Sequence, residues 1–574
     1  MKYWKLVNVK NPIWFIFGLI TVFLAIGVTT FFMLCGPGPI TLTGEVDSVV
    51  SSGISGRFGT VTESLGRGLF VLSYESITGN KDDLQLQDVT GQLRELQTTW
   101  DMSFPSAKKV DGVWTLFGPL NLKSIGPNGK TATGKGSIAN NGPALKWDQG
   151  IWYGLSPMVW NDLSCQGRGK WTLPAGWYRD LIGRLVVENG PVCWLANKGG
   201  DILSMDANKI RVDLDFQEGR MEDVTANLVG GCIKAKVVDI DKNYVNWYGP
   251  VSFVRDDGWH GSSDRCRTPR SLRSGSDIEK VELNLFQAKR EAIGGVELVS
   301  ADHAKWTKAG LLLEGNARLE QPLDGKIISL QASKIFQRSG LGGDFSPDMP
   351  VGAIWAGPQA VMFWDAKSLI SSHHIEGIRK TRQWSISAPA NGRWENVTFT
   401  AGEGRGNPAR WAFNGPISAN LGDGFVASGD SLLWEGGTFT LVGRPVSLNR
   451  SREKLTGRRL VLRKKVLEFQ EGVVGALMTA DEDINIKADR GKILRTLINL
   501  YGQVECVGRY WRLRADSVSV TIGAGNIVKQ VNGSGSVFFS GQMGEGRGDA
   551  ISLDLCKKTA DWLGKVKAIV GTSS

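Results

Sequence analysis

Apolar and polar residues alternate along much of the chain, which is the pattern of β-strands with one buried face. In the stretch WAFNGPISA, residues 411 to 419, alternate apolar side chains fall on one face of a predicted strand, and Gly415 occupies the middle of that face. A glycine inside a strand weakens it and typically marks a bend, a bulge or a close approach of two backbones. The pattern therefore predicts a strand that bends sharply at Gly415.

The same register, with alternating apolar positions before and after a glycine, recurs along the chain. The copies are WTLFGPLNL, VNWYGPVSF, LLLEGNARL, WAFNGPISA, FTLVGRPVS, INLYGQVEC and ADWLGKVKA, and their central glycines are Gly118, Gly249, Gly315, Gly415, Gly443, Gly502 and Gly564. These glycines are spaced at roughly whole multiples of a unit of about 28 to 33 residues, and a strand motif that recurs at a fixed period indicates a stacked repeat.

If each repeat folds over at its glycine, two sheets face each other and their apolar side chains point into a cleft. The predicted fold is therefore mainly β, an extended repetitive sheet that folds over on itself and encloses an apolar cleft. The alternative is a set of ordinary β-sandwiches whose inner faces are filled. The residues expected to line the cleft are Trp114, Leu116, Leu120, Val245, Trp247, Val251, Phe253, Leu311, Leu313, Ala317, Leu319, Trp411, Phe413, Ile417, Ile498, Leu500, Val504, Trp562 and Val566.

The composition agrees with a chain of strands and tight turns. The 574 residues include 73 glycines and 21 tryptophans, and they allow two to four ordinary domains or one repetitive body. The 67 basic residues exceed the 57 acidic ones, an excess that suits a phospholipid, a glycolipid or a nucleic acid without selecting among them.

The N-terminal region contains an apolar run, residues 13 to 34, that carries no charge. A helix of this length spans a hydrocarbon core of about 30 Å, so we expect one N-terminal transmembrane helix. Lys2, Lys5 and Lys10 precede it without any acidic residue, which predicts a single-pass membrane protein whose N-terminus is cytoplasmic and whose body lies on the other side of the membrane. The alternative is a cleaved signal peptide.

Motifs of catalysis and metal binding are missing from the sequence. The seven cysteines include no CxxC pair, the four histidines do not suggest a zinc site, and we find no dinucleotide-binding or phosphate-binding glycine loop. We therefore expect no cofactor, no metal and no enzymatic activity. In an oxidising compartment, Cys165 and Cys193, or Cys232 and Cys266, have a spacing that permits a disulfide.

A basic stretch, residues 450 to 465, holds eight lysines and arginines. It lacks the interleaved aromatic residues that stack on bases, so we interpret it as a solvated strand edge or a contact with anionic lipid, and we expect no nucleic-acid partner.

The expected organisation has five parts. They are a cytoplasmic tip (1–12), the transmembrane helix (13–34), a first β region (35–261), a basic linker or loop (262–277) and a second β region (278–574).

Two segments, 500–555 and 311–335, carry a resemblance to a known family. In the first, a Leu-x-Gly-x-Val strand is followed by a strand containing Ala515 and Asp516, a glycine-centred strand from Gly533 to Gly541, and the sequence RGDA at 547–550. LLLEGNARLEQPLDGKIISLQASKI is similar, with Ala332 and Ser333 in place of the Ala-Asp pair. These segments resemble the OstA-like periplasmic proteins of lipopolysaccharide transport, of the LptA and LptC type.

The resemblance implies a β-jellyroll whose cleft carries the acyl chains of lipopolysaccharide, or of a similar anionic glycolipid, towards the outer membrane. It implies an inner-membrane ABC transporter as one partner, and a further β-jellyroll protein or an outer-membrane translocon at the C-terminal edge. The first β region then takes the position of LptC and the second that of LptA. The resemblance thus implies a single-pass inner-membrane protein with a periplasmic body. The alternative is an extracytoplasmic glycan-binding or glycan-processing β protein in which tryptophans stack on sugars.

Overall fold

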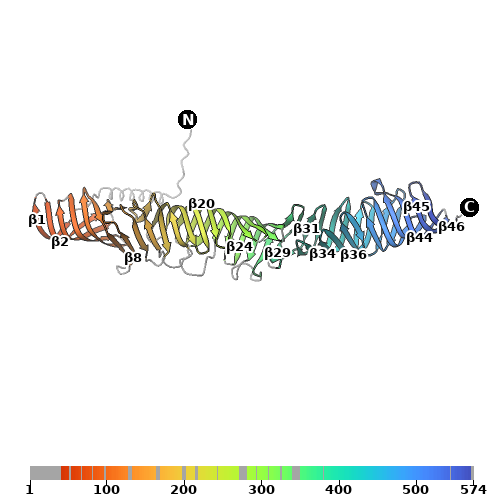
Figure 1. Ribbon diagram of the computed structural model, residues 1–574, viewed down its shortest axis with the longest axis horizontal. Coiled ribbons are helices and arrows are strands. Elements are labelled where there is room, and N and C mark those ends of the chain that lie inside the picture. Colours follow the sequence, from red (N-terminus) through yellow and green to blue (C-terminus); the bar gives the residue numbers. More distant parts are fainter. Residues whose placement is uncertain are drawn as a thin grey trace, which may run out of the picture. The chain divides into compact units, whose positions relative to one another are not determined.

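The computed structural model describes residues 41–569, apart from short internal stretches of which the longest are 270–280 and 339–348. Nearly all of the described chain is β-strand, and the one helical element in it is a short 3-10 turn, η1 (Ala524–Asn526). Every strand pairing among the described residues is antiparallel, and Figure 1 shows the strands in sequence order.

The membrane helix expected at the N-terminus is a point that the structure corrects. Residues 13–34 lie outside the described residues, and no helix within the described ones is long and apolar enough to cross a membrane. An apolar run of that length is compatible with a span but does not by itself establish a helix. For the described chain, the fold class with a transmembrane helix and the single-pass inner-membrane location are therefore wrong.

The chain divides into two compact units, Met1–Leu283 and Asn284–Ser574. Residues 262–269, which were expected to belong to a linker, form part of strand β21 (His260–Pro269), and this strand pairs with β20 (Tyr244–Arg255). The remainder of that predicted linker lies outside the described residues.

Unit 1 consists of strands joined by short connections. They are β1 (Thr41–Val50), β2 (Gly53–Leu65), β3 (Gly68–Gly79), β4 (Asp83–Arg94), β5 (Thr99–Val110), β6 (Val113–Phe117), β7 (Leu120–Ile125), β8 (Ala132–Ile138), β9 (Pro143–Asp148), β10 (Ile151–Gly154), β11 (Met158–Asp162), β12 (Gly169–Leu173), β13 (Tyr178–Arg179), β14 (Arg184–Val187), β15 (Val192–Ala196), β16 (Ile202–Ala207), β17 (Lys209–Asp213), β18 (Gly219–Leu228), β19 (Gly231–Ile240), β20 and β21.

Unit 2 has the same construction, and β22 (Val281–Ala292) contains the boundary between the units. The strands that follow are β23 (Gly295–Trp306), β24 (Gly310–Leu323), β25 (Lys326–Arg338), β26 (Ala353–Gly357), β27 (Ala360–Asp365), β28 (Ser368–Ser372), β29 (Ile375–Ile378), β30 (Gln383–Ile386), β31 (Ala390–Trp394), β32 (Val397–Ala401), β33 (Gly404–Asn407), β34 (Arg410–Gly422), β35 (Phe425–Glu435), β36 (Thr438–Arg450), β37 (Glu453–Arg463), β38 (Val466–Phe469), β39 (Val473–Met478), β40 (Asp483–Ala488), β41 (Arg490–Ile493), β42 (Leu497–Val507), β43 (Trp511–Ile522), β44 (Val528–Gly541), β45 (Gly544–Asp554) and β46 (Thr559–Ile569).

Long strands pair with two short strands, one along each end. In unit 1, β5 pairs with β6 along residues 106–110 and with β7 along residues 99–103. In unit 2, β34 receives β33 along residues 410–413 and β32 along residues 418–420. Each unit is therefore a sheet folded into two layers that are joined along the middle of its long strands.

We name each layer by a residue within it. Unit 1 has a Trp100 layer and a Trp114 layer, which contain the two ends of β5, and unit 2 has a Phe413 layer and an Ala419 layer, which contain the two ends of β34. Rings from opposite layers are in contact, for example Phe70 with Trp147, whose centroids lie 4.1 Å apart. The layers of a unit thus pack face to face, as alternation with period two requires.

The bend between the layers answers the question raised by Gly415. The register of β34 against β35 shifts between Asn414 and Ile417, and Gly415 has φ +93°, in the left-handed region that glycine adopts readily. Gly415 is exposed on the outside of the bend rather than in the middle of the buried face. The bend contains two residues without a partner in β35, Gly415 and Pro416. The side chains of Phe413 and Ile417 on either side of it therefore point to the same inner face.

The other glycines of the motif fall into two groups. Gly249, Gly315, Gly502 and Gly564 also have positive φ values, whereas Gly118 and Gly443 do not and lie beside the cis peptide bonds Gly118–Pro119 and Arg444–Pro445.

Candidate functional site

The inner surface between the layers is the main candidate site. Sixteen of the expected cleft residues are at most 5% exposed: Trp114, Leu116, Leu120, Val245, Trp247, Val251, Leu311, Leu313, Ala317, Leu319, Trp411, Phe413, Ile417, Ile498, Leu500 and Val504. The three others differ, since Phe253 and Trp562 are half-buried and Val566 is 37% exposed. Trp562 and Val566 lie in β46, which pairs with β45 on one side and has no strand on its other side among the described residues.

Aromatic rings fill much of this inner surface in unit 2. Trp394 of the Ala419 layer stacks on Trp434 of the Phe413 layer, with centroids 5.2 Å apart and ring planes 4° from parallel. Trp364 likewise faces Trp411 from the opposite layer at 5.9 Å. At the positions where these rings meet, the layers are held together by aromatic contact, as in the filled alternative weighed above.

Several of these tryptophans have a buried indole N–H group that donates no hydrogen bond in the described structure. In unit 2 the N–H groups of Trp364, Trp394 and Trp411 have no hydrogen-bond partner in the described structure, although the three residues are at most 4% exposed. A buried donor without an acceptor costs about 1–3 kcal/mol. Sequence analysis did not find these donors, because nothing in the alternation shows which indole meets an acceptor.

A charged pair crosses the interior of unit 1. The Nζ of Lys109 lies 2.9 Å from Oε1 of Glu63, and the indole N–H of Trp114 donates to Oε2 of the same carboxylate at 2.7 Å. Glu63 belongs to the Trp100 layer, whereas Lys109 and Trp114 belong to the Trp114 layer. Sequence reasoning missed this pair, and its only signal is a charge of each sign at an inward position of an alternating strand.

Opposite the bends, the hairpin turns of the two layers face each other, and we call this open side the mouth. Contacts cross it at several points. In unit 1, both guanidinium NH groups of Arg179 contact the carboxylate of Glu95 at 2.7 Å. In unit 2, Nη1 of Arg450 donates to the carbonyl oxygen of Arg495 at 2.9 Å, and Lys558 lies 3.1 Å from Asp481.

Arg450 and Glu453 form a buried pair beside this crossing. Their side chains are 4% and 5% exposed, and Nε of Arg450 donates to Oε2 of Glu453 at 2.8 Å. Burial raises the pKa of the Glu453 carboxyl, and the neighbouring Arg450 charge opposes that effect only in part.

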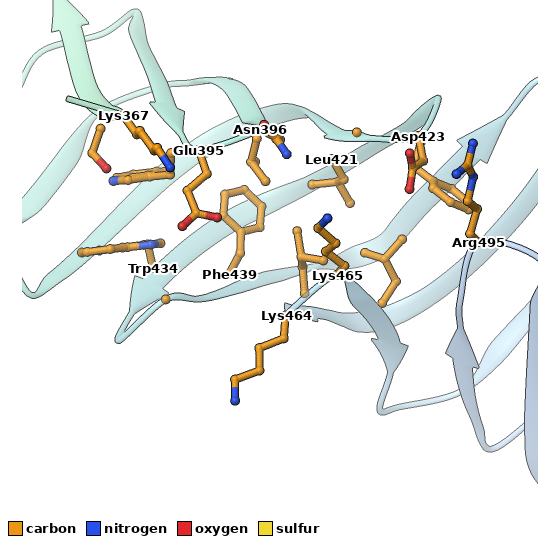
Figure 2. Close-up of a pocket in the computed structure, with 18 of the residues that line it drawn as sticks. Lys367, Glu395, Asn396, Leu421, Asp423, Trp434, Phe439, Lys464, Lys465 and Arg495 are labelled. Carbon is orange, nitrogen blue, oxygen red and sulfur yellow. The ribbon is translucent and has the colours of Figure 1, made fainter. Parts of the chain in front are cut away.

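The mouth of unit 2 is hollowed into a pocket of about 850 Å³ (Figure 2). Its walls come from turns of both layers: 365–368, 394–397 and 421–425 from the Ala419 layer, and 462–467 and 493–495 from the Phe413 layer. Its floor is apolar and includes Trp394, Trp434, Phe439 and Leu462. The pocket thus connects the aromatic interior with the surface.

The cysteines do not form the disulfides considered from the sequence. Cys232 and Cys266 are both free, and β20 lies between their strands. Cys193 is free as well, and Cys165 lies outside the described residues. Burial raises the pKa of the Cys266 and Cys506 thiols to about 12, which leaves both unreactive at neutral pH.

The described tryptophans bear on the glycan alternative. None of them is exposed, and the half-buried Trp355, which alternates with the buried Ile354 and Ala356, has its ring stacked on His374, so no described indole is fully presented to a sugar. Compared with protein-family models and with curated protein sequences, the chain matches none.

Proposed function

We propose that this chain is a lipid-transfer protein that holds the acyl chains of lipopolysaccharide, or of a similar glycolipid, on the inner surface between its layers. The observation that carries the proposal is the buried apolar face that runs through successive bent strands and opens at the mouth of unit 2. The resemblance of residues 311–335 and 500–555 to OstA-like proteins points to the same class of cargo.

Physically, the inner surface would replace the interior of a bilayer. Burial of apolar area stabilises acyl chains by about 25 cal/mol per Å², whatever the detailed structure of the acyl chain. Movement of an acyl chain between similar strands therefore changes its free energy of binding little. The chain therefore acts without covalent chemistry in this proposal. Direction has to come from partners, for which the resemblance suggests an ABC transporter and a further β-jellyroll protein or outer-membrane translocon.

Unit 2 contains many inner-face side chains that touch one another, so an acyl chain has to enter where the layers separate. The pocket at the mouth, with the half-buried Trp434 in its wall, is such a place. The glycan-binding alternative lacks a comparable observation in the described structure, since the described outer faces present no exposed indole.

The test uses photoreactive benzoylphenylalanine, incorporated into the full chain and exposed to lipopolysaccharide. Residues 313, 413 and 500 are buried on the inner face, whereas their neighbours 314, 414 and 501 are not. We expect lipid adducts at the first three positions and little or no labelling at the second three. Equal labelling at the inner positions and at their neighbours would show that lipid does not occupy the inner surface.

A further inference from the structure

Two-residue turns place charged side chains on the two lips of the pocket in unit 2. Glu395 lies in the turn between β31 and β32, and Asp423 in the turn between β34 and β35, on the Ala419 layer. Lys464 and Lys465 form the turn between β37 and β38 on the Phe413 layer, and Arg495 follows β41 on the same side. The first lip also carries Lys367, in the turn between β27 and β28, so it is mainly acidic whereas the other is basic, as Figure 2 shows.

These charges are free to bind a ligand. All six side chains are exposed, and none of them takes part in an ion pair within the described part of the chain. The neighbouring Arg450 pairs with Glu453, and it also donates a hydrogen bond across the mouth to the carbonyl oxygen of Arg495. The pocket is therefore an opening in the mouth that is bounded on one side by the hydrogen bond between Arg450 and Arg495.

Beneath the lips lies an apolar floor that contains one unused donor. Trp394 is 4% exposed and lines the pocket, and its indole N–H has no acceptor among the described residues. A hydrocarbon chain alone would leave this donor unsatisfied. A ligand with an acceptor oxygen between its chain and its head group would satisfy it.

We propose that this pocket is a lateral portal that binds a zwitterionic amphiphile, whose head group carries both a phosphate and an ammonium. The phosphate lies against Lys464, Lys465 and Arg495, and the ammonium lies against Glu395 and Asp423. The acyl chain lies on the apolar floor beside the stacked pair of Trp394 and Trp434, against Phe439 and Leu462. An ester oxygen near the head group accepts the Trp394 N–H. The portal rests on the proposed lipid-transfer function, because it gives lateral access to the same inner surface.

The test compares vesicles of phosphatidylethanolamine, which is zwitterionic, with vesicles of phosphatidylglycerol, which is anionic. Benzoylphenylalanine at position 396, on the acidic lip, reports the portal, and the same residue at position 413 reports the inner surface. We expect adducts at 396 to form about fivefold more readily with phosphatidylethanolamine, the scale of one or two exposed charge contacts. The double variant Glu395→Lys, Asp423→Lys should remove this preference.

The matched control is Asp111→Lys, which makes the same charge reversal in an exposed turn of unit 1, between β5 and β6, and should leave the preference unchanged. Labelling at 413 without labelling at 396 would overturn the portal while the proposed function stands. Equal labelling at 396 by both lipids, or a preference that survives the double variant, would overturn the zwitterionic head group. Labelling at neither position would overturn the portal, and the proposed function would then stand or fall with the lipopolysaccharide labelling at 313, 413 and 500.

Discussion

At the scale of single residues, four of the bends, which we call corners, pair a glycine with an aspartate. A Cβ added to Gly315, Gly502, Gly535 or Gly564 would meet the side chain of Asp302, Asp489, Asp516 or Asp549 at 3.0 Å or less. In two corners the aspartate also holds the bend directly, since Asp549 accepts the N–H of Lys565 at 3.0 Å and Asp302 accepts the side-chain amide of Asn316 at 2.9 Å. The Ala-Asp pair that contributes to the resemblance therefore has a structural role at the corner.

Gly502→Ala should lower the free energy of unfolding by about 1–3 kcal/mol, because it adds both a strained φ and a clash with Asp489. The control is Gly472→Ala, at a glycine with φ +70° and no atom within 4 Å of the added Cβ, which isolates the cost of the φ alone. Urea denaturation measures both variants. If Gly502→Ala is no more destabilising than the control, the contact with Asp489 does not shape the corner.

At the scale of elements, the two layers of a unit are joined by more than the bends. In unit 1 the buried pair of Glu63 and Lys109 links the layers from within, and Glu95 and Arg179 link them at the mouth. A buried ion pair adds little net stability over an apolar pair of the same shape, but removal of one partner leaves an uncompensated charge. The interior of unit 1 therefore contains an ion pair that links the two layers, in addition to its apolar side chains.

Glu63→Gln should destabilise the protein by about 3–5 kcal/mol, because Lys109 would stay buried without a countercharge. The double variant Glu63→Gln, Lys109→Met should recover much of that loss. Asp83→Asn is the control, since Asp83 faces Lys108 at 3.6 Å in an exposed pair and its loss should cost less than about 1 kcal/mol. If Glu63→Gln and Asp83→Asn lower the free energy of unfolding by similar amounts in denaturant titrations, Glu63 and Lys109 do not form a buried ion pair between the layers.

At the scale of the whole molecule, the last strand offers a surface for assembly. β46 pairs with β45, and its other edge has no partner strand among the described residues. Val566 on this strand is 37% exposed, whereas the matching Val504 in β42 is 1% exposed. A free strand edge with half-covered apolar residues invites a further strand, and a partner there would continue the inner surface.

We therefore expect a second β-jellyroll protein, or another copy of this chain, to pair with residues 560–569. Val566→Pro removes one backbone donor and should abolish this association, as measured by light scattering or by co-purification with the partner. Thermal melting followed by circular dichroism should show the variant still folded. Unchanged association, together with unchanged lipid transfer, would leave the C-terminus as a plain strand end.

The fold and the inner face were predictable from the sequence to the extent that local alternation decides them. Leu313, Phe413 and Leu500 lie inside because side chains in a strand alternate between its faces, and the glycines mark bends because their φ is open to values that other residues rarely adopt. The same local pattern does not show where a sheet ends. Trp562 and Val566 are less buried than the alternation predicts, because β46 has a described partner strand on one side only. Gly415 is exposed rather than inward because the bend shifts the register, a property of the pairing.

The sequence by itself determined the bent strands and the apolar inner face, since both depend on residues a few positions apart. Only the tertiary structure decided which turns meet across the mouth, because that depends on how two layers pack. It brought Glu395 and Asp423 opposite Lys464 and Lys465, and it placed Glu63 against Lys109, 46 residues along the chain. It also left the N–H of Trp394 without an acceptor, since the partner of a buried donor is set by the groups that packing brings within about 3 Å.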